Sequence, residues 1–450
     1  MATWMFFADL LGSKYAFFVA IIGDCLGVFT GMSLAWSSSV LVKLKEAKDN
    51  PLGEPITAEQ HDLIGSVFAI GGAVGPIVLI YSLEYFGRKM TMLILAMLFP
   101  ISHFILAFST HIHLYYVCRI LCGAAVGGSF SIVAVYISEI VSTKMRGTYM
   151  SLATSFILTG CLISYSVGPF VSIRTFNLII AISSLLYIPL FIFLCPETLY
   201  YTMQKHGSGE TVKLLQKLRN TDLVEEELGE IENAVGKEEK ASLLDVLKDK
   251  AALKAFFICT VLLTFQQFSG INVIMTYTQN IFEDAKVSVS PEICTIIVSS
   301  FQTATCLITP IASKKFNRKV MLAFAFTGVG LSNVLLGLYF SVDFVHKFNW
   351  VPLLSIVSFV IFHNCGVGAL PWTTLGELYP QKIKSVGTAV TNTIYWLFQF
   401  LLTYYFNKID EGLAFILFGV MCWACVIFVK VFLIETRGRT LQEIQDKLRR

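Results

Sequence analysis

Residues 253–277, LKAFFICTVLLTFQQFSGINVIMTY, form one continuous stretch in which Lys254 is the only charged residue. The stretch is 25 residues long, whereas a helix needs about 20 mostly apolar residues to cross the hydrocarbon core of a bilayer. A helix is the expected conformation, because an unpaired backbone amide in lipid costs several kcal/mol. The segment therefore predicts a transmembrane helix, and the polar residues inside it need a separate explanation.

Eleven other apolar stretches of similar length occur along the chain. Hydrophobic residues make up 55% of the 450 residues and charged residues 14%, whereas soluble domains contain about 45–50% apolar and about 25% charged residues. The mean hydropathy of +0.69 agrees with this difference. We predict an all-α membrane protein with twelve transmembrane helices, at residues 15–36, 63–83, 91–109, 114–138, 148–169, 176–195, 253–277, 293–313, 320–341, 351–374, 387–406 and 412–434.

The composition excludes several classes of protein. A net charge of +3 over 450 residues provides no basic surface that would attract nucleic acid. The eleven cysteines, including CWAC at 422–425, lie in or beside apolar stretches, where cysteine packs as a small hydrophobic residue. We therefore expect no disulfides and no metal site. The sequence contains no glycine-rich phosphate loop and no nucleophile paired with a base, so we also expect no cofactor, no ATP-driven pumping and no enzymatic activity.

The distribution of Lys and Arg predicts the orientation. The connections on the side of both termini carry 25 of these residues, whereas the connections on the opposite side carry 7. Because cytoplasmic loops are enriched in Lys and Arg, both termini are expected in the cytoplasm. His103, His111 and His113 lie near the outer ends of the third and fourth spans, where an interfacial location is expected.

Three short motifs occur twice. FGRK at 86–89 returns as FNRK at 316–319, ISEI at 137–140 as LGEL at 375–378, and PET at 196–198 as IET at 434–436. The spacings between copies are 230, 238 and 238 residues, which indicates two similar halves with six spans each. Transporters built in this way bind substrate between the halves near the middle of the membrane.

The repeat defines the expected domains. Residues 1–199 form an N-terminal six-helix bundle and residues 253–434 a C-terminal six-helix bundle, and residues 435–450 form a cytoplasmic tail. Residues 200–252 are the only long polar stretch, and their apolar residues recur at helical spacing. We interpret this stretch as a cytoplasmic helical linker. A docking site for a partner is the alternative interpretation.

The polar sequence QQFSGIN at 266–272 predicts a binding element. Polar residues inside a membrane span usually have a function, and amides can hydrogen-bond neutral hydroxyl groups without adding charge. Gly270 beside Ser269 would allow the helix to unwind, so that Gln266, Gln267 and Asn272 converge on one site, as in the broken helices of transporters. The alternative is that these amides only join neighbouring helices.

The same motif, together with YISEI at 136–140, SVGPF at 166–170, PETLYY at 196–201 and ALPWTTLGELYP at 369–380, resembles the sugar-porter branch of the major facilitator superfamily. Within that branch the motifs are most similar to facilitated trehalose transporters and their facilitative glucose relatives. The resemblance covers essentially the whole chain. It implies a carrier in the plasma membrane that moves a neutral sugar, trehalose or a hexose such as glucose, by alternating access.

The resemblance also implies site residues. Trp372, which follows Pro371 and the Gly366/Gly368 pair, is expected against the sugar, since an aromatic ring suits the apolar face of a sugar. Around the amides and Trp372, the predicted site is completed by Tyr277, Trp396, Thr154 and Gln302. For the tryptophans, the alternative is membrane anchoring or core packing.

Charged residues at the cytoplasmic ends of the spans form a second predicted group. Similar residues in the family make ion pairs between helices that hold the inner gate shut when the cavity faces outward. Partly exposed pairs contribute only about 0–1 kcal/mol each, so they can break during a transport cycle. A purely topogenic role is the alternative. The predicted gate residues are Arg88, Glu139, Arg146, Glu197, Arg318, Glu377, Lys384 and Glu435.

Three expected sugar-facing positions differ from the family pattern. Thr154 replaces a Gln in the fifth span, Gln302 replaces an Asn in the eighth, and Tyr395 replaces an Asn in the eleventh. Neither the identity of the sugar nor the oligomeric state follows from these residues. A sugar-sensing receptor that does not transport is therefore a second functional hypothesis.

Asp24 in the first span motivates a third hypothesis. It shares a helix face with Gly27 and Gly31, so it should face packed protein, where a pair with Arg119 is geometrically feasible. A buried acid could couple transport to protons. Proton symporters of the family, however, carry their acid in a motif that aligns near residues 29–30. A structural Asp24 is therefore the preferred interpretation, and proton-coupled symport is the alternative.

Overall fold

The structure is a computed structural model that describes residues 13–47, 50–142, 145–236, 249–313, 315–380, 383–437, 439 and 441–449. Every regular element in these ranges is a helix. Eleven helical segments are long and apolar enough to cross a membrane. The expected all-α membrane fold is therefore observed.

The N-terminal half contains six spans. The first is divided at Cys25 into two helices, and the second and third run together as one long helix that bends at Gly87. Gly87 has a φ of +79°, a left-handed conformation that glycine adopts without strain. The elements are α2 (Lys14–Asp24), α3 (Leu26–Lys45), α4 (Ala58–Phe108), α5 (Ile112–Ile140), α6 (Arg146–Val167), the 3₁₀ turn Gly168–Phe170, and α7 (Ile173–Leu194).

The predicted linker also contains helices. Its described part forms α8 (Leu199–His206), α9 (Ser208–Arg219) and α10 (Glu225–Gly236). Residues 237–248 of the linker lie outside the described residues. The C-terminal tail adds α22 (Leu441–Arg449).

The C-terminal half is more irregular. Its seventh span is divided between two helices, and its tenth contains a π-helical turn at His363–Val367. The elements are α12 (Lys250–Gln267), α13 (Ile271–Asp284), α14 (Pro291–Thr305), α15 (Ile308–Ala312), α16 (Arg318–Ser341), α17 (Asp343–His346), α18 (Val351–Phe362), α19 (Leu370–Leu378), α20 (Lys384–Phe406) and α21 (Glu411–Val431).

The span expected at 387–406 corresponds to α20, which is not among the eleven most apolar segments. It is 23 residues long, and its buried polar residues include Thr391, Asn392, Gln399 and Thr403. These side chains face protein, because α20 packs between α12 of its own half and α4 of the other half. We therefore count α20 as the twelfth spanning helix.

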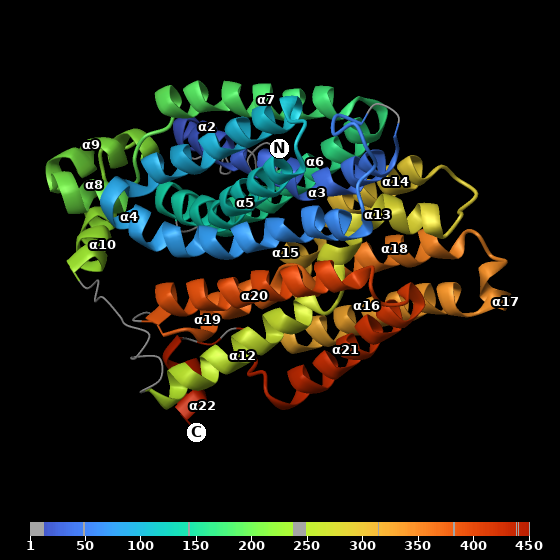
Figure 1. Cartoon of the computed structure of the whole chain (residues 1–450). Coiled ribbons are helices and arrows are strands. Elements are labelled where there is room, and N and C mark those ends of the chain that lie inside the picture. Colours follow the sequence, from blue (N-terminus) through green and yellow to red (C-terminus); the bar gives the residue numbers. More distant parts are fainter. Residues whose placement is uncertain are drawn as a thin grey trace, which may run out of the picture.

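The two halves lie side by side with their helices roughly parallel (Figure 1). The contacts between the halves are made by α4 with α20, α3 with α13, and α6 with α14. Linker helices α8 to α10 and tail helix α22 lie at the same end of the molecule (Figure 1). These three helix pairs form the main interface between the halves.

The halves are joined at the end opposite the linker. The Nδ2 atom of Asn407, which follows α20, donates to Oδ1 of Asp62 on α4 at 2.6 Å. The ring of His61 stacks on Tyr277 of α13, with 5.4 Å between ring centroids. Ser38 of α3 accepts the backbone N–H of Gln279 at 3.1 Å. We refer to the contacts of His61, Asp62, Tyr277 and Asn407 as the outer seal.

Candidate functional site

The seventh span breaks where the sequence predicts. Helix α12 ends at Gln267, Gly270 adopts a φ of +83°, and α13 begins at Ile271. On a continuous helix, Gln267 and Asn272 would point about 140° apart. Across the break, Nδ2 of Asn272 instead donates to Oε1 of Gln267 at 2.8 Å. The left-handed glycine therefore brings these two amides together.

The amides also contact helix α20 and the turn that precedes α19. Nε2 of Gln267 donates to the backbone carbonyl of Tyr395 at 3.1 Å, and Nδ2 of Asn272 donates to the Tyr395 hydroxyl at 3.2 Å. Gln266 turns toward the tenth span, where its Nε2 donates to the Gly368 carbonyl at 3.2 Å. We call Gln266, Gln267 and Asn272 the amide cluster. These contacts join helices, as the alternative interpretation requires.

One acceptor atom of the amide cluster is not used by these contacts. Oε1 of Gln266 is buried and has no hydrogen-bond partner within the described part of the chain. A buried polar atom without a partner costs about 1–3 kcal/mol. A hydroxyl group supplied by a ligand would satisfy it. Helix joining alone does not account for this acceptor.

Two tryptophans lie next to the cluster but in different surroundings. The Trp372 ring is half-buried and meets the Tyr395 ring edge-on, with centroids 5.1 Å apart. Trp396 is only 2% exposed and packs against Phe68 and Phe130 of the N-terminal half. Trp372 thus remains accessible to a ligand, whereas Trp396 fills the interface between the halves.

The other three predicted site residues have surroundings of their own. Tyr277 is buried in the outer seal, where its hydroxyl donates to the Thr403 carbonyl at 3.2 Å. The amide of Gln302 lies 3.9 Å from the sulfur of Met275 on α13. Thr154 on α6 is exposed. Within the described residues, none of the three is joined to the amide cluster by a hydrogen bond or ring contact.

The charged residues at the linker end of the N-terminal half form a compact group. Arg88 pairs with Glu139 at 2.9 Å, which connects the bend of α4 to the end of α5. The Glu197 carboxylate accepts the backbone N–H groups of Arg88 and Lys89, each at 3.1 Å. Burial raises the pKa of Glu197, and the backbone hydrogen bonds to its carboxylate act in the opposite direction.

The C-terminal half repeats this arrangement. Arg318 pairs with Glu377 at 2.5 Å. The Glu435 carboxylate accepts the backbone N–H groups of Arg318 at 3.2 Å and of Lys319 at 3.1 Å. The motif copies found in the sequence therefore adopt one geometry in both halves.

The ion pairs join helices within one half. Within the described ranges, none of the observed pairs connects the two halves. Across the interface, Lys384 lies within electrostatic range of Arg146, a group of like charge, and of Glu377 in its own half. In this structure the pairs stiffen each bundle, and their action as a gate remains a prediction.

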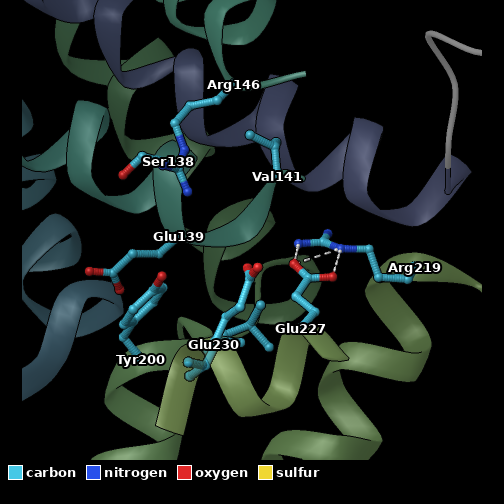
Figure 2. A pocket seen from close by; sticks show the side chains of 10 residues that line it. Ser138, Glu139, Val141, Arg146, Tyr200, Arg219, Glu227 and Glu230 are labelled. Atoms are coloured by element: carbon cyan, nitrogen blue, oxygen red, sulfur yellow. Dashed lines mark hydrogen bonds and ion pairs between the residues drawn. The ribbon is translucent and has the colours of Figure 1, made fainter. Parts of the chain in front are cut away.

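A small polar pocket of about 20 Å³ lies where the linker meets the N-terminal half (Figure 2). Glu139, Arg146 and Glu230 line it. Beside it, Arg219 of α9 binds both carboxylate oxygens of Glu227, at 2.9 and 2.6 Å. Arg219 also donates to the carbonyl of Ile140, the last residue of α5, at 2.8 Å. The sequence did not identify Arg219 as the residue that fixes the linker.

The pair of Asp24 and Arg119, which the sequence left feasible, is not formed in this structure. Arg119 donates to the Ser33 carbonyl at 3.0 Å and to the Ser37 hydroxyl at 2.8 Å. These residues lie 9 and 13 positions beyond Asp24, which corresponds to about 14–20 Å along a helix. Asp24 is fully buried at the end of α2, and neither carboxylate oxygen has a hydrogen-bond partner among the residues that are described.

The interfacial location expected for His103 is also wrong. Its ring is fully buried, with Nδ1 at 2.9 Å from Oδ1 of Asn177 and Nε2 at 3.2 Å from the Ser33 hydroxyl. The indole N–H of Trp36 donates to the same Asn177 oxygen at 3.0 Å. A histidine inside an apolar run is itself a signal of a polar partner. The interfacial location predicted for His103 did not take this signal into account.

Comparison with known proteins gives consistent matches. The family model described as sugar (and other) transporter matches residues 16–448. A protein named facilitated trehalose transporter Tret1 from Culex quinquefasciatus is 32% identical, over 96% of this chain and 85% of the relative. The Anopheles gambiae protein of the same name is 31% identical over 96% of this chain, which spans only 56% of that longer relative.

A solved structure has the same fold. The inward-open structure of the xylose transporter XylE from E. coli superimposes with a TM-score of 0.82 at 22% identity, covering 96% of this chain and 99% of XylE. The likeness shows the architecture of twelve helices in two bundles.

Proposed function

Because the chain belongs to the sugar (and other) transporter family, we propose that it carries a neutral sugar down its gradient across the membrane by alternating access. Membership in a transporter family agrees with the expectation that the chain is not an enzyme. The major facilitator fold predicted from the sequence is confirmed by the likeness to XylE. The observation that carries the proposal is the broken seventh span, which places three amides next to a half-buried tryptophan.

The chemistry of this region suits a sugar. The amide cluster provides donors and acceptors without a charge, and the Trp372 ring can cover the apolar face of a pyranose. The unpartnered oxygen of Gln266 would accept a sugar hydroxyl. We place Thr154, Gln302, Tyr277 and Trp396 in a second layer that adjusts the site when the halves move. Trehalose and glucose are the proposed substrates.

Alternating access requires the two ends of the pathway to open in turn. The outer seal closes one end through the hydrogen bond from Asn407 to Asp62 and the stack of His61 on Tyr277. The proposed cycle breaks these contacts as the halves rotate. The eight cytoplasmic charged residues act as the inner gate, because their ion pairs keep each bundle rigid and can exchange partners when the halves approach.

The proposed location is the plasma membrane, with both termini in the cytoplasm. The orientation is supported by the excess of Lys and Arg in the connections at the linker end. Linker helices and tail helix share that end (Figure 1). Protease accessibility of the linker in right-side-out vesicles tests this orientation, and cleavage from outside would contradict it.

Reconstitution of the purified protein into liposomes tests the function. Gln267→Ala removes both the acceptor of Asn272 and the donor to Tyr395, so uptake of every transported sugar should fall by about 10-fold or more. Gln204→Ala, at an exposed position on α8, is the matched control and should not change uptake. Equal uptake by wild type and Gln267→Ala for every sugar in the panel would show that the assigned site is wrong.

The surroundings of Asp24 favour a second candidate function, which is proton-coupled symport. Its carboxylate is buried at the break between α2 and α3, and both oxygens are without hydrogen-bond partners in the described ranges. A carboxyl group in such a site exists most easily in protonated form. Sugar uptake into liposomes should then alkalinise the outside in wild type and leave external pH unchanged in Asp24→Asn. Uptake without any pH change in wild type supports the facilitator instead.

A further inference from the structure

Tyr395 on α20 contacts four residues of the proposed site, one of which is its neighbour Trp396, at 5.9 Å between ring centroids. Its hydroxyl accepts from Nδ2 of Asn272, and its carbonyl accepts from Nε2 of Gln267. Its ring lies edge-on to Trp372, at 5.1 Å between centroids and an interplanar angle of 72°. One side chain therefore touches both the polar and the aromatic part of the site.

The donors of Asn272 and Gln267 are all in use in this structure. A side-chain amide has two N–H groups. Those of Asn272 reach Oε1 of Gln267 and the Tyr395 hydroxyl. Those of Gln267 reach the Tyr395 carbonyl and Oε1 of Gln399, at 3.1 and 3.5 Å. A sugar hydroxyl can receive a hydrogen bond from Asn272 only after one of these partners leaves.

The Tyr395 hydroxyl is the partner that can leave. The Asn272–Gln267 contact is shorter, 2.8 Å against 3.2 Å, and it spans the helix break. The Tyr395 carbonyl belongs to helix α20 and is fixed. The phenol ring is attached through rotatable bonds and is half-buried. It presents a hydroxyl to Asn272 and an aromatic ring to Trp372, the two features that a sugar would offer with its own hydroxyl and apolar face.

We propose that Tyr395 determines sugar affinity and selectivity by occupying the empty site, so that a sugar binds by displacing its phenol from Asn272 and Trp372. This inference rests on the proposed function. Any sugar that hydrogen-bonds to Asn272 must first break the hydrogen bond between Asn272 and the Tyr395 hydroxyl, which lowers its affinity. A larger sugar must also occupy the volume that the Tyr395 ring fills.

Two substitutions at one position separate the hydroxyl from the ring. Tyr395→Phe removes the hydrogen bond to Asn272 and keeps the ring volume, so glucose and trehalose should both bind about 2- to 10-fold more tightly. Tyr395→Ala also removes the ring, so trehalose should gain more than glucose. Tyr405→Phe, at a half-exposed position near the end of the same helix, is the control and should bind both sugars as wild type does.

The coupling to Asn272 distinguishes displacement from a general structural effect. Affinities are measured by titration calorimetry on the full-length protein in detergent, and Trp372 fluorescence should report the departure of the Tyr395 ring. In an Asn272→Ala background, adding Tyr395→Phe should give no further gain, because there is no amide left to release. A general change in packing would give the same gain in both backgrounds.

The outcomes are distinct. Tighter binding in Tyr395→Phe that disappears in the Asn272→Ala background supports the inference. If wild type binds sugar and Tyr395→Phe binds it more weakly or equally well, the inference alone is overturned. Weaker binding would mean that the hydroxyl contacts the sugar directly, and unchanged binding that it has no role in binding. Binding of no sugar by any variant or by wild type overturns the proposed function, and the inference with it.

Discussion

In the N-terminal half, Arg88 pairs with Glu139 while Glu197 accepts three backbone N–H groups. In the C-terminal half, Arg318 pairs with Glu377 while Glu435 accepts three. A further match lies one residue beyond the paired glutamates. The carbonyl of Ile140 accepts from Arg219 of the linker at 2.8 Å, and that of Leu378 accepts from Gln445 of the tail at 2.7 Å. The ends of the two halves that face the linker and the tail thus share one arrangement of contacts.

The interiors differ. In the N-terminal half, the buried His103, Asn177 and Trp36 are joined by hydrogen bonds, although other buried polar atoms of that half, including both carboxylate oxygens of Asp24, have no partner within the described residues. In the C-terminal half, the seventh span is broken at Gly270 and Oε1 of Gln266 has no partner within the described residues. A satisfied network stabilises a fold, whereas an open one leaves atoms for a ligand. The repeat therefore provides two similar halves, and we propose that the departures from it in the seventh span provide the binding site.

The largest effect is expected at the helix break. Gly270→Ala places a side chain in the left-handed region and brings its Cβ within 2.6 Å of the Phe418 ring. Strain and overpacking together cost about 3 kcal/mol, so sugar uptake per folded molecule should fall about 100-fold. Gly207→Ala in the linker also places a side chain at a positive φ, +78°, but with a ψ of −174° and open space around it, and it should leave uptake nearly unchanged. Equal effects of the two variants would mean that the break has no special role.

A second pair of variants tests the difference between the interiors. Asn177→Ala leaves Nδ1 of His103 and the indole N–H of Trp36 without their shared partner and should cost about 1–3 kcal/mol of stability, which lowers the unfolding temperature but leaves sugar affinity within about 2-fold. Gln266→Ala should weaken sugar binding by about 5- to 10-fold and change the unfolding temperature less. If both variants lost stability and affinity in the same proportion, the proposed division of roles would fail.

The smallest effect is expected at the repeated cytoplasmic pairs. Each pair is partly exposed, with side-chain exposures of 15% and 12% for Arg88 and Glu139, and 19% and 33% for Arg318 and Glu377. Such pairs contribute about 0–1 kcal/mol. Glu139→Gln and Glu377→Gln should therefore each change the initial rate of uptake by no more than about 5-fold, and in the same direction. A large change in one half only would contradict the equivalence of the two ends.

Much of the fold could be predicted from the sequence, because hydrocarbon thickness and backbone hydrogen bonding leave few choices. The repeated motifs identify Arg88 and Arg318 as equivalent residues, because a constant spacing between motif copies can be recognised without knowledge of packing. Gly270 could be identified as the position of the helix break because few other residues tolerate a left-handed conformation. The most polar span, α20, was found by length although its composition is the least apolar.

The predictions that failed concern distances between residues. The helix face on which a residue lies does not determine these distances. Asp24 and Arg119 lie on suitable faces, but the position of Arg119 along the axis brings it to Ser33 and Ser37 instead. Tyr395 was recognised as a departure from the family pattern, yet its contact with Asn272 depends on how α20 and α13 are placed. The anchoring role of Arg219 likewise depends on where the linker folds back. Contacts between distant segments are the part that sequence patterns leave open.

The central claim is that the halves must separate at the outer seal for a sugar to cross. The most direct measurement is sugar uptake by liposomes containing Asp62→Cys/Asn407→Cys, before and after oxidation, with each single variant and wild type treated alike as controls for the eleven native cysteines. The double variant should lose at least about 90% of its uptake on oxidation and recover it when the disulfide is reduced. Undiminished uptake by a fully cross-linked double variant would contradict the account.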